Sequence, residues 1–154
     1  MMTNKSQYRL TESTHHAQPK LWQSAGLPAS GGIELINAIQ KGLSIDIITR
    51  LNDELDVSKM YILNATGINE RSFARRKTEH GRLKPEESER VARLVRIMDS
   101  AIALFEGDKK AAVEWFNTSA STLGHHSPKE MLATETGALE VTNLIGRLEH
   151  GVFS

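Results

Sequence analysis

The stretch WFNTSASTLGHHSPKEMLATETGALEVTNLIGRLEHGVFS, residues 115–154, decides how the last quarter of this chain folds. Within it, Ser127 and Glu130 have the spacing of a capping box, in which each side chain bonds the other residue's backbone amide. Pro128 occupies the first helical position, where its missing N–H costs nothing. The sequence therefore predicts a short helix over about 128–133.

A second helix is predicted over about 135–150, because apolar residues recur there at three- and four-residue steps. They are Leu139, Val141, Leu144, Ile145 and Leu148. Gly151 is suited to end this helix, since glycine readily adopts the left-handed conformation. Val152 and Phe153 follow it, and two interpretations stay open: they are offered to the pocket of a partner, or they fold back onto Trp115, Phe116 and Leu148.

Upstream of this stretch, apolar periodicity and capping residues predict further helices and no strand. Ser44, Ser58, Asn69 and Asp108 are the expected N-caps, and residues 117–126 are expected to form a loop. The predicted helices cover about 33–41, 45–56, 59–66, 70–79, 85–105 and 109–116.

The first part of the chain is polar, carries prolines and a Gly-Gly pair, and shows no sustained period. Residues 1–31 are therefore expected to form a flexible arm, in which Leu21, Trp22 and Leu27 could dock locally. The fold class predicted from the whole pattern is all-α, with two helical lobes after the arm. The expected domains are 1–31, 32–100 and 101–154.

Composition limits the function classes. The 154 residues have a formal net charge of zero, so any affinity for nucleic acid must come from a local basic cluster. The absence of cysteine excludes disulfides, thiolate metal sites and cysteine nucleophiles. The sequence shows neither an apolar run of membrane-spanning length nor a secretory signal. We therefore expect a cytoplasmic protein that does not contact a membrane.

A local basic cluster does occur, on a predicted helix-turn-helix over residues 58–79. Gly67 supplies the tight turn and Phe73 the large apolar anchor that such a motif needs. The candidate DNA-binding residues are Asn69 at the start of the second helix, Arg71, Ser72 and Arg75 for base edges, and Arg76, Lys77 and Arg82 for phosphates. The alternative is an ordinary helix pair of a bundle, and Leu63 favours it, because DNA-binding motifs often have a small residue there.

No catalytic or metal site is expected. The histidines, at positions 15, 16, 80, 125, 126 and 150, lack the helical or tight-loop spacing of metal ligands. There is no phosphate-binding glycine loop and no G-x-S-x-G motif. The sequence therefore predicts a protein that is not an enzyme and needs no cofactor.

The C-terminal segments resemble the Xre/MbcA/ParS toxin-binding domain. The segments that carry the resemblance are AAVEWFNT (111–118), LG (123–124), SP (127–128), LATETGA (132–138) and GRLEHGVF (146–153). The preceding lobe is similar to the degenerate Cro-like helix-turn-helix that accompanies this domain in the antitoxins of RES-Xre toxin–antitoxin pairs. The resemblance covers about residues 42–154.

This resemblance implies an antitoxin that dimerises, represses its own operon by binding promoter DNA, and neutralises a RES-domain toxin that depletes NAD⁺. In the family, the terminal R-x-E-x-G-V pattern lies at or in the active-site cleft of the toxin. The matching residues and those that follow are the expected toxin-binding set: Arg147, Glu149, His150, Gly151, Val152, Phe153 and Ser154.

Two other functions remain open from the sequence. One is a stand-alone helix-turn-helix transcription regulator whose C-terminal lobe dimerises or binds a small effector. The other is an interaction protein whose helix-turn-helix no longer contacts DNA.

Overall fold

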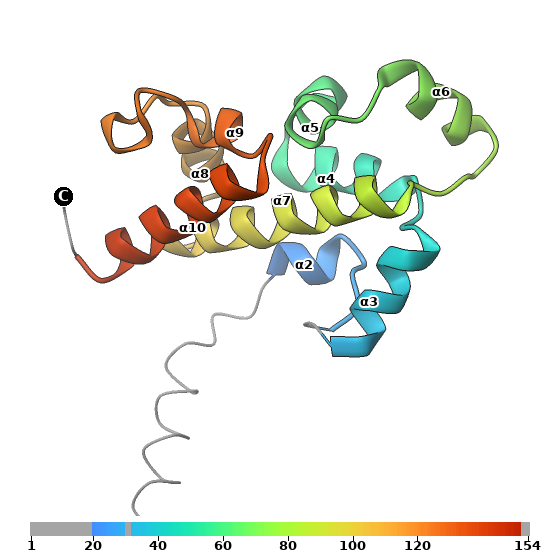
Figure 1. Ribbon diagram of the computed structural model, residues 1–154, viewed down its shortest axis with the longest axis horizontal. Helices are drawn as coiled ribbons and strands as arrows, with labels where there is room; N and C mark the ends of the chain where they lie inside the picture. The colour runs from blue at the N-terminus through green and yellow to red at the C-terminus, as the bar shows by residue number, and fades with distance from the viewer. Residues whose placement is uncertain (1–19, 30–31, 152–154) are drawn as a thin grey trace, which may run out of the picture.

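The computed structural model describes residues 20–29 and 32–151, and these residues form an all-helical fold without strands (Figure 1). The predicted fold class is confirmed. The helices are α2 (Lys20–Ser24), α3 (Gly32–Lys41), α4 (Asp46–Leu55), α5 (Lys59–Thr66), α6 (Glu70–Thr78), α7 (Pro85–Leu104), α8 (Lys109–Phe116), the short 3₁₀ helix η1 (Ser121–Leu123), α9 (Pro128–Met131) and α10 (Glu135–Glu149).

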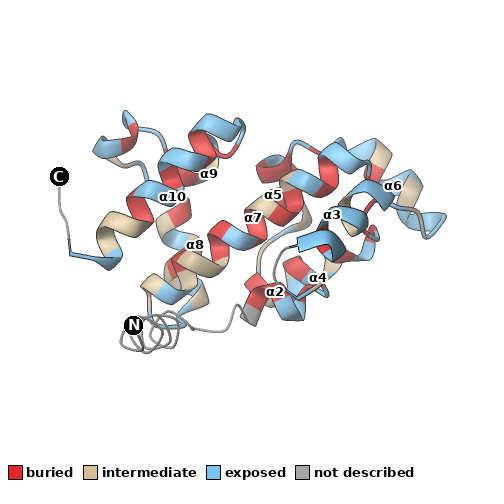
Figure 2. Cartoon of the chain, turned by 60° about the horizontal axis from the view of Figure 1, so that its bottom comes forward, coloured by how far each residue is buried: buried red, intermediate tan, exposed pale blue. Residues whose placement is uncertain are grey.

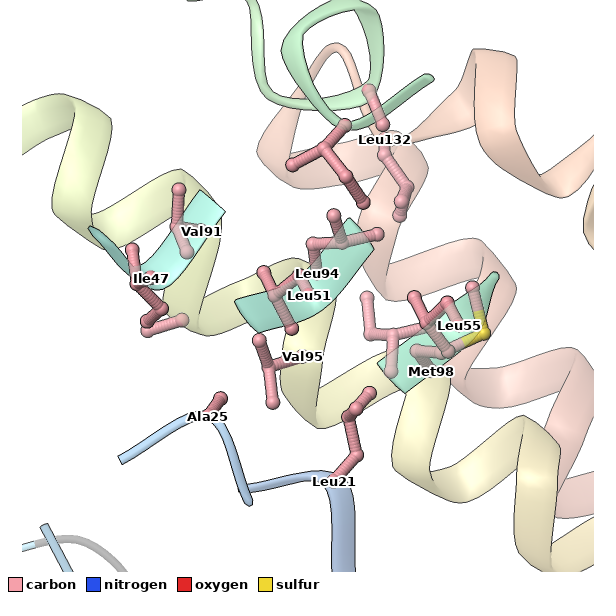
Figure 3. Packing of buried hydrophobic residues seen from close by; sticks show 14 of the residues in the cluster. Leu21, Ala25, Ile47, Leu51, Leu55, Val91, Leu94, Val95, Met98 and Leu132 are labelled. Carbon is pink, nitrogen blue, oxygen red and sulfur yellow. The ribbon is translucent and has the colours of Figure 1, made fainter. Parts of the chain in front are cut away.

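The longest helix, α7, is the axis of the molecule. Its 20 residues span about 30 Å, and α2, α3, α5, α8 and α10 all pack against it. Figure 3 shows Val91, Leu94, Val95 and Met98 of α7 meeting apolar side chains of α2 and α4. The sequence predicted one helix over about 85–105, and the structure confirms it.

The N-terminal lobe consists of α2–α6 on the first part of α7, and the C-terminal lobe of α8–α10 on the rest of it (Figure 1). The predicted domain boundary at residue 100 falls inside α7, so that both lobes share this helix. Cationic side chains also join the lobes. Lys109 forms an ion pair with Glu54 at 2.9 Å, and the ammonium of Lys129 lies 4.2 Å from the ring centroid of Tyr61.

The predicted N-terminal arm is too long at its C-terminal side, because residues 20–29 pack into the fold. Leu21, Trp22 and Leu27 are buried, which confirms their predicted docking. The backbone amides of Leu21 and Trp22 each donate to the Asp99 carboxylate at 2.9 Å. Burial raises the pKa of Asp99, although these two hydrogen bonds act in the opposite direction. Residues 1–19 lie outside the described part of the chain.

Ser44 stands at the start of α4, as predicted. Its side-chain hydroxyl accepts a hydrogen bond from the Asp46 amide at 3.3 Å, although the residue directly before the helix is Ile45, which has no capping side chain. A backbone bridge between Ser44 and Arg82 also fixes this segment against the loop before α7. Gly42 is required beside it: its φ is +91°, and an added Cβ would lie 2.2 Å from the Leu83 carbonyl oxygen.

The first predicted apolar stripe is only partly buried. On α3, Leu35 packs into the core, whereas Ile33 and Ile36 are 66% and 50% exposed (Figure 2). Helix α3 lies at the edge of the N-terminal lobe and contacts α7. The repeat of apolar residues correctly predicted a helix. Its apolar residues, however, extend around more of the helix than the side that packs against the rest of the fold.

Candidate nucleic-acid interface and C-terminal surface

Helices α5 and α6 form the predicted helix-turn-helix, with both predicted caps in place. The side chain of Ser58 accepts a hydrogen bond from the Tyr61 amide at 3.2 Å, and that of Asn69 accepts one from the Ser72 amide at 3.1 Å. Gly67 ends α5 in the left-handed conformation, with φ +68°. These local bonds fix the path of the chain from one helix to the next.

Helix α7 also holds the turn between α5 and α6. The guanidinium of Arg90 donates to the Thr66 carbonyl oxygen at 2.6 Å, which satisfies a carbonyl in the last turn of α5. Thr66 itself is buried, and its hydroxyl donates to the Ile62 carbonyl oxygen at 2.7 Å. No local pattern in the sequence points to Arg90, because its partner lies 24 residues away.

Phe73 is the apolar anchor of α6, as predicted, and is 1% exposed. It is the one buried residue of this helix. The ammonium groups of Lys59 and Lys77 lie 5.5 and 5.7 Å from its ring centroid, within the range of a cation–π contact. Lys59 was not among the sequence candidates, yet the fold brings it from α5 to the same ring as Lys77.

Arg76 has a different environment from the one expected of a phosphate contact. Its guanidinium binds the Glu87 carboxylate through two hydrogen bonds of 2.6 and 3.0 Å. It also donates to the carbonyl oxygens of Ser72 and Arg82. The two side chains are 12% and 9% exposed, so the guanidinium is turned inward. Arg76 therefore fastens α6 to the start of α7, and its guanidinium does not face solvent as a phosphate contact would.

The ion pair shifts the titration of both groups. Desolvation alone would raise the pKa of Glu87, but the hydrogen bond from Arg76, the backbone amide of Lys84 and the nearby charges outweigh it, so the pKa is lowered. The hydrogen bond to Glu87 raises the pKa of Arg76. Both groups are thus held in their charged forms.

The outward face of α6 carries Arg71 and Arg75, which are exposed and one helical turn apart. Ala74 is exposed next to Arg75 and three residues after Arg71. Ser72 is half-buried, and Asn69 is exposed and engaged in the cap.

Two further candidates lie beside this face. Lys77 is exposed near the end of α6. Arg82 is exposed as well, but its guanidinium donates to the Gly42 carbonyl oxygen at 2.9 Å. The cationic groups that the fold leaves available on this surface are therefore Lys59, Arg71, Arg75 and Lys77, which is a basic patch on a chain of zero net charge.

The C-terminal surface is organised by α10. The Thr134 hydroxyl caps the helix by accepting from the Gly137 amide at 2.9 Å. Gly137 allows close packing against α9, because an added Cβ would lie 2.0 Å from the Met131 carbonyl oxygen. Ala138, Val141, Leu144 and Ile145 are buried against the rest of the fold. The structure thus confirms the predicted helix, but Leu139, which the sequence placed in its apolar repeat, is 57% exposed and does not belong to the buried face.

The predicted end of the chain is described as far as Gly151, which has φ +68° and follows α10 as expected. Arg147 is half-buried, whereas Glu149, His150 and Gly151 are exposed. Within the ranges that the structure describes, Arg147 and Glu149 form no ion pair. Val152, Phe153 and Ser154 lie outside those ranges, so both interpretations of the apolar end remain predictions.

The described histidines do not gather into a ligand set. His126 Nδ1 lies 3.1 Å from a Glu130 carboxylate oxygen, and both side chains are largely exposed. No group of three His, Cys, Asp or Glu side chains that could hold a metal ion occurs among residues 20–29 and 32–151. Over the same residues, no helix combines the length and apolar character needed to cross a membrane.

Comparison with known proteins agrees with this arrangement of two lobes. Residues 34–96 match the family model described as the antitoxin Xre-like helix-turn-helix domain. Residues 100–151 match the model described as the antitoxin Xre/MbcA/ParS C-terminal toxin-binding domain.

Two relatives extend these matches over most of the chain. The chain is 55% identical over 134 residues to a protein of Yersinia enterocolitica named antitoxin Xre, which covers 87% of this chain and 90% of the relative. It is 41% identical over 147 residues to a Photorhabdus laumondii protein of the same name, covering 95% and 99%. Similarity at this level, over nearly the whole of each protein, concerns both lobes together.

Proposed function

The chain belongs to the Xre family of antitoxins, and from this premise we propose that it neutralises a RES-domain toxin and represses its own operon. The toxin of this proposal is an enzyme that depletes NAD⁺. The antitoxin acts on it by binding alone, without chemistry or a cofactor of its own. Because the toxin's substrate and the promoter are both cytoplasmic, the antitoxin of this proposal acts in the cytoplasm.

The observation that carries the toxin-binding proposal is the way α10 is held. Five buried residues fix this helix to the fold, and the exposed Gly151 ends it at the edge of the C-terminal lobe. A rigid helix can present the residues that follow it with little further loss of conformational entropy. Two apolar residues, Val152 and Phe153, follow Gly151 in the sequence and can enter an active-site cleft of the toxin.

In this proposal the toxin-binding residues are Arg147 and 149–154, and the toxin-binding domain is 101–154. The apolar tip, Val152 and Phe153, blocks the toxin's active site sterically. Arg147 and Glu149 lie on the last turn of α10 and form no ion pair with other described residues, so their charges are available to a partner.

Deletion of residues 151–154 in the full chain tests this proposal. We expect the toxin, co-expressed with the deleted antitoxin, to deplete cellular NAD⁺ and arrest growth, because the active site is no longer blocked. A matched variant, Val152→Ser with Phe153→Ser, keeps the chain length and removes only the apolar tip. Wild-type neutralisation and toxin binding by the deletion variant would contradict the proposal.

The DNA-binding part of the proposal rests on domain 32–100. Arg71 and Arg75 contact base edges, and Lys77 and Lys59 contact phosphates. A homodimer presents two α6 helices to two half-sites of the promoter. Light scattering checks the dimer: the expected mass is twice the 17.1 kDa of one chain.

A further inference from the structure

Two residues on the outward side of α10, Leu139 and Gly146, are not explained by packing within the chain itself. Leu139 is 57% exposed, one of four large apolar side chains that are exposed among the described residues. Gly146 lies in the interior of the same helix, where glycine lowers stability relative to alanine. Neither residue contributes to the buried set of α10.

The two glycines of α10 show why Gly146 is unusual. Gly137 is needed because any side chain there would collide with the Met131 carbonyl oxygen. At Gly146, an added Cβ would meet no atom within 4 Å, and its φ is not positive. The fold therefore tolerates alanine at Gly146 and gains nothing from glycine. Glycine at such a position is explained if another molecule approaches the helix backbone closely, because a side chain would then be in the way.

Leu139 and Gly146 share one side of the helix. Seven residues separate them, which is about two helical turns or roughly 10 Å along the axis. Asn143 lies between them and His150 one turn beyond, at helical steps of four, three and four residues. We call Leu139, Asn143, Gly146 and His150 the outer stripe of α10. Leu139, Asn143 and His150 are exposed, and Gly146 is half-buried.

We propose that the outer stripe is a docking surface for the toxin, separate from the tip that blocks the active site. An apolar recess of the toxin receives Leu139, and a segment of toxin backbone lies against Gly146. Leu139 and Gly146 carry no charged or polar side-chain group, whereas Asn143, His150 and the neighbouring Arg147 supply polar groups beside them. An apolar centre with a polar rim is the usual anatomy of a protein interface.

The toxin fits this surface better than a second copy of the chain, because the stripe continues into the proposed toxin-binding end. His150 belongs to both, and Gly151 follows directly. A second antitoxin bound along the stripe would cover the end that must reach the toxin. This inference rests on the proposed function: if the chain binds no RES-domain toxin, the stripe has no such occupant.

The test uses the full-length antitoxin and the purified toxin, with the dissociation constant measured by calorimetry. We expect Gly146→Ala and Leu139→Ala each to weaken binding about tenfold or more. Gly146→Ala should at the same time raise the Tm of the free antitoxin by about 1–3 °C, because alanine favours the helix. Lower affinity in a more stable protein cannot be explained by misfolding.

Glu140→Ala is the matched control. Glu140 is exposed on the same helix, about 100° around it from Leu139, and its variant should bind within twofold of wild type. Wild-type affinity of both Gly146→Ala and Leu139→Ala would overturn the inference. So would a change in the mass of the free antitoxin by light scattering with unchanged toxin affinity, since the stripe would then be a self-association surface.

The two proposals fail in different ways. If the wild-type antitoxin does not bind the toxin, the proposed function is wrong, and this inference with it. If the wild type binds, and deletion of residues 151–154 abolishes inhibition while both stripe variants bind normally, only this inference is wrong. If the stripe carries affinity, the deletion variant should keep measurable binding although it no longer inhibits.

Discussion

Helices α6 and α10 both face outward, but the fold holds them in different ways. Helix α6 has nine residues and one buried side chain, Phe73. Helix α10 has fifteen residues, five of them buried. An apolar face fixes α10, whereas α6 relies on one ring and on the Arg76–Glu87 ion pair. Most positions of α6 carry charged or polar side chains, which leaves few positions for apolar residues that could pack into the core. One of its basic residues, Arg76, therefore helps to hold the helix through an ion pair.

Helix α7 supports both of these surfaces. Its first turns hold α6 and the preceding turn through Glu87 and Arg90. Farther along, Arg93 donates to the Leu132 carbonyl oxygen at 3.2 Å, next to the start of α10. A single helix therefore fixes the distance between the candidate DNA face and the candidate toxin surface.

The largest effect is expected from Phe73→Ala. The change removes the one buried side chain of α6 and leaves a cavity, which should lower the free energy of unfolding by about 3–5 kcal/mol. Urea denaturation measures it. Leu144→Ala is the counterpart in α10, where four other buried residues remain. If α6 is held mainly by its ion pair, Phe73→Ala will cost no more than Arg76→Ala, and the ring is then not the main anchor of this helix.

A smaller loss is expected from Glu87→Gln, about 2–3 kcal/mol at neutral pH, since Arg76 then keeps a mostly buried charge without its counter-ion. The pKa of Glu87 is lower in the folded state than its ordinary value of 4.5. The stabilisation is therefore fully present above pH 4.5 and is lost as the pH falls through the folded pKa.

Urea denaturation at several pH values checks this. The difference in stability between wild type and Glu87→Gln should shrink as the pH falls below 4.5, because protonated Glu87 resembles glutamine. A difference that stays constant down to pH 3 would mean that the carboxylate charge does not stabilise the fold.

Local signals explain which parts of this arrangement could be predicted from the sequence. The caps Ser58, Asn69 and Ser127 act on amides three residues away, and each was predicted correctly. The helical repeats of α7 and α10 likewise predicted those helices, although Leu139 of the α10 repeat is exposed. Features that depend on neighbouring residues in the chain are visible in the order of the residues alone.

Long-range contacts explain the rest. Helix α2 has only five residues, too few for a helical repeat to be recognised, and it is fixed by Asp99, 77 and 78 residues away in sequence. The inward turn of Arg76 depends on Glu87 across a loop. The difference between Gly137 and Gly146 depends on whether α9 approaches, which no property of the two glycines themselves reveals.

On α6, Arg71 and Arg75 face outward, whereas Arg76 is paired with Glu87. The third prediction follows from this difference and concerns DNA binding rather than stability. Arg71→Ala and Arg75→Ala should each weaken promoter binding by about 1–3 kcal/mol at fixed salt, while the Tm stays unchanged, because neither side chain is buried. Lys77→Ala should weaken binding to all sequences alike and reduce the salt slope by about one.

Arg76→Ala is the informative counterpart on the same helix. It removes the same charge as Arg71→Ala but should lower the Tm, since it breaks the pair with Glu87. If Arg76→Ala weakens promoter binding as much as Arg71→Ala does, without a change in Tm, then Arg76 contacts DNA and the inward geometry is not the one that binds.

The smallest effect is expected at the junction between the two lobes, at Tyr61. Its hydroxyl is buried, and no hydrogen-bond partner for it occurs among the described residues; burial raises its pKa to about 12. Tyr61→Phe removes this unsatisfied group and keeps the ring that Lys129 contacts. The free energy of unfolding should stay within about 1 kcal/mol of wild type or rise, as urea denaturation would show.

Lys129→Ala should instead lower the free energy of unfolding by about 0.5–1 kcal/mol, because the cation–π contact is lost. A larger loss in Tyr61→Phe than in Lys129→Ala would mean that the hydroxyl is bound after all. The junction between the two lobes would then depend on a polar interaction, as α6 depends on the Arg76–Glu87 ion pair. It would not depend mainly on packing, as α10 does.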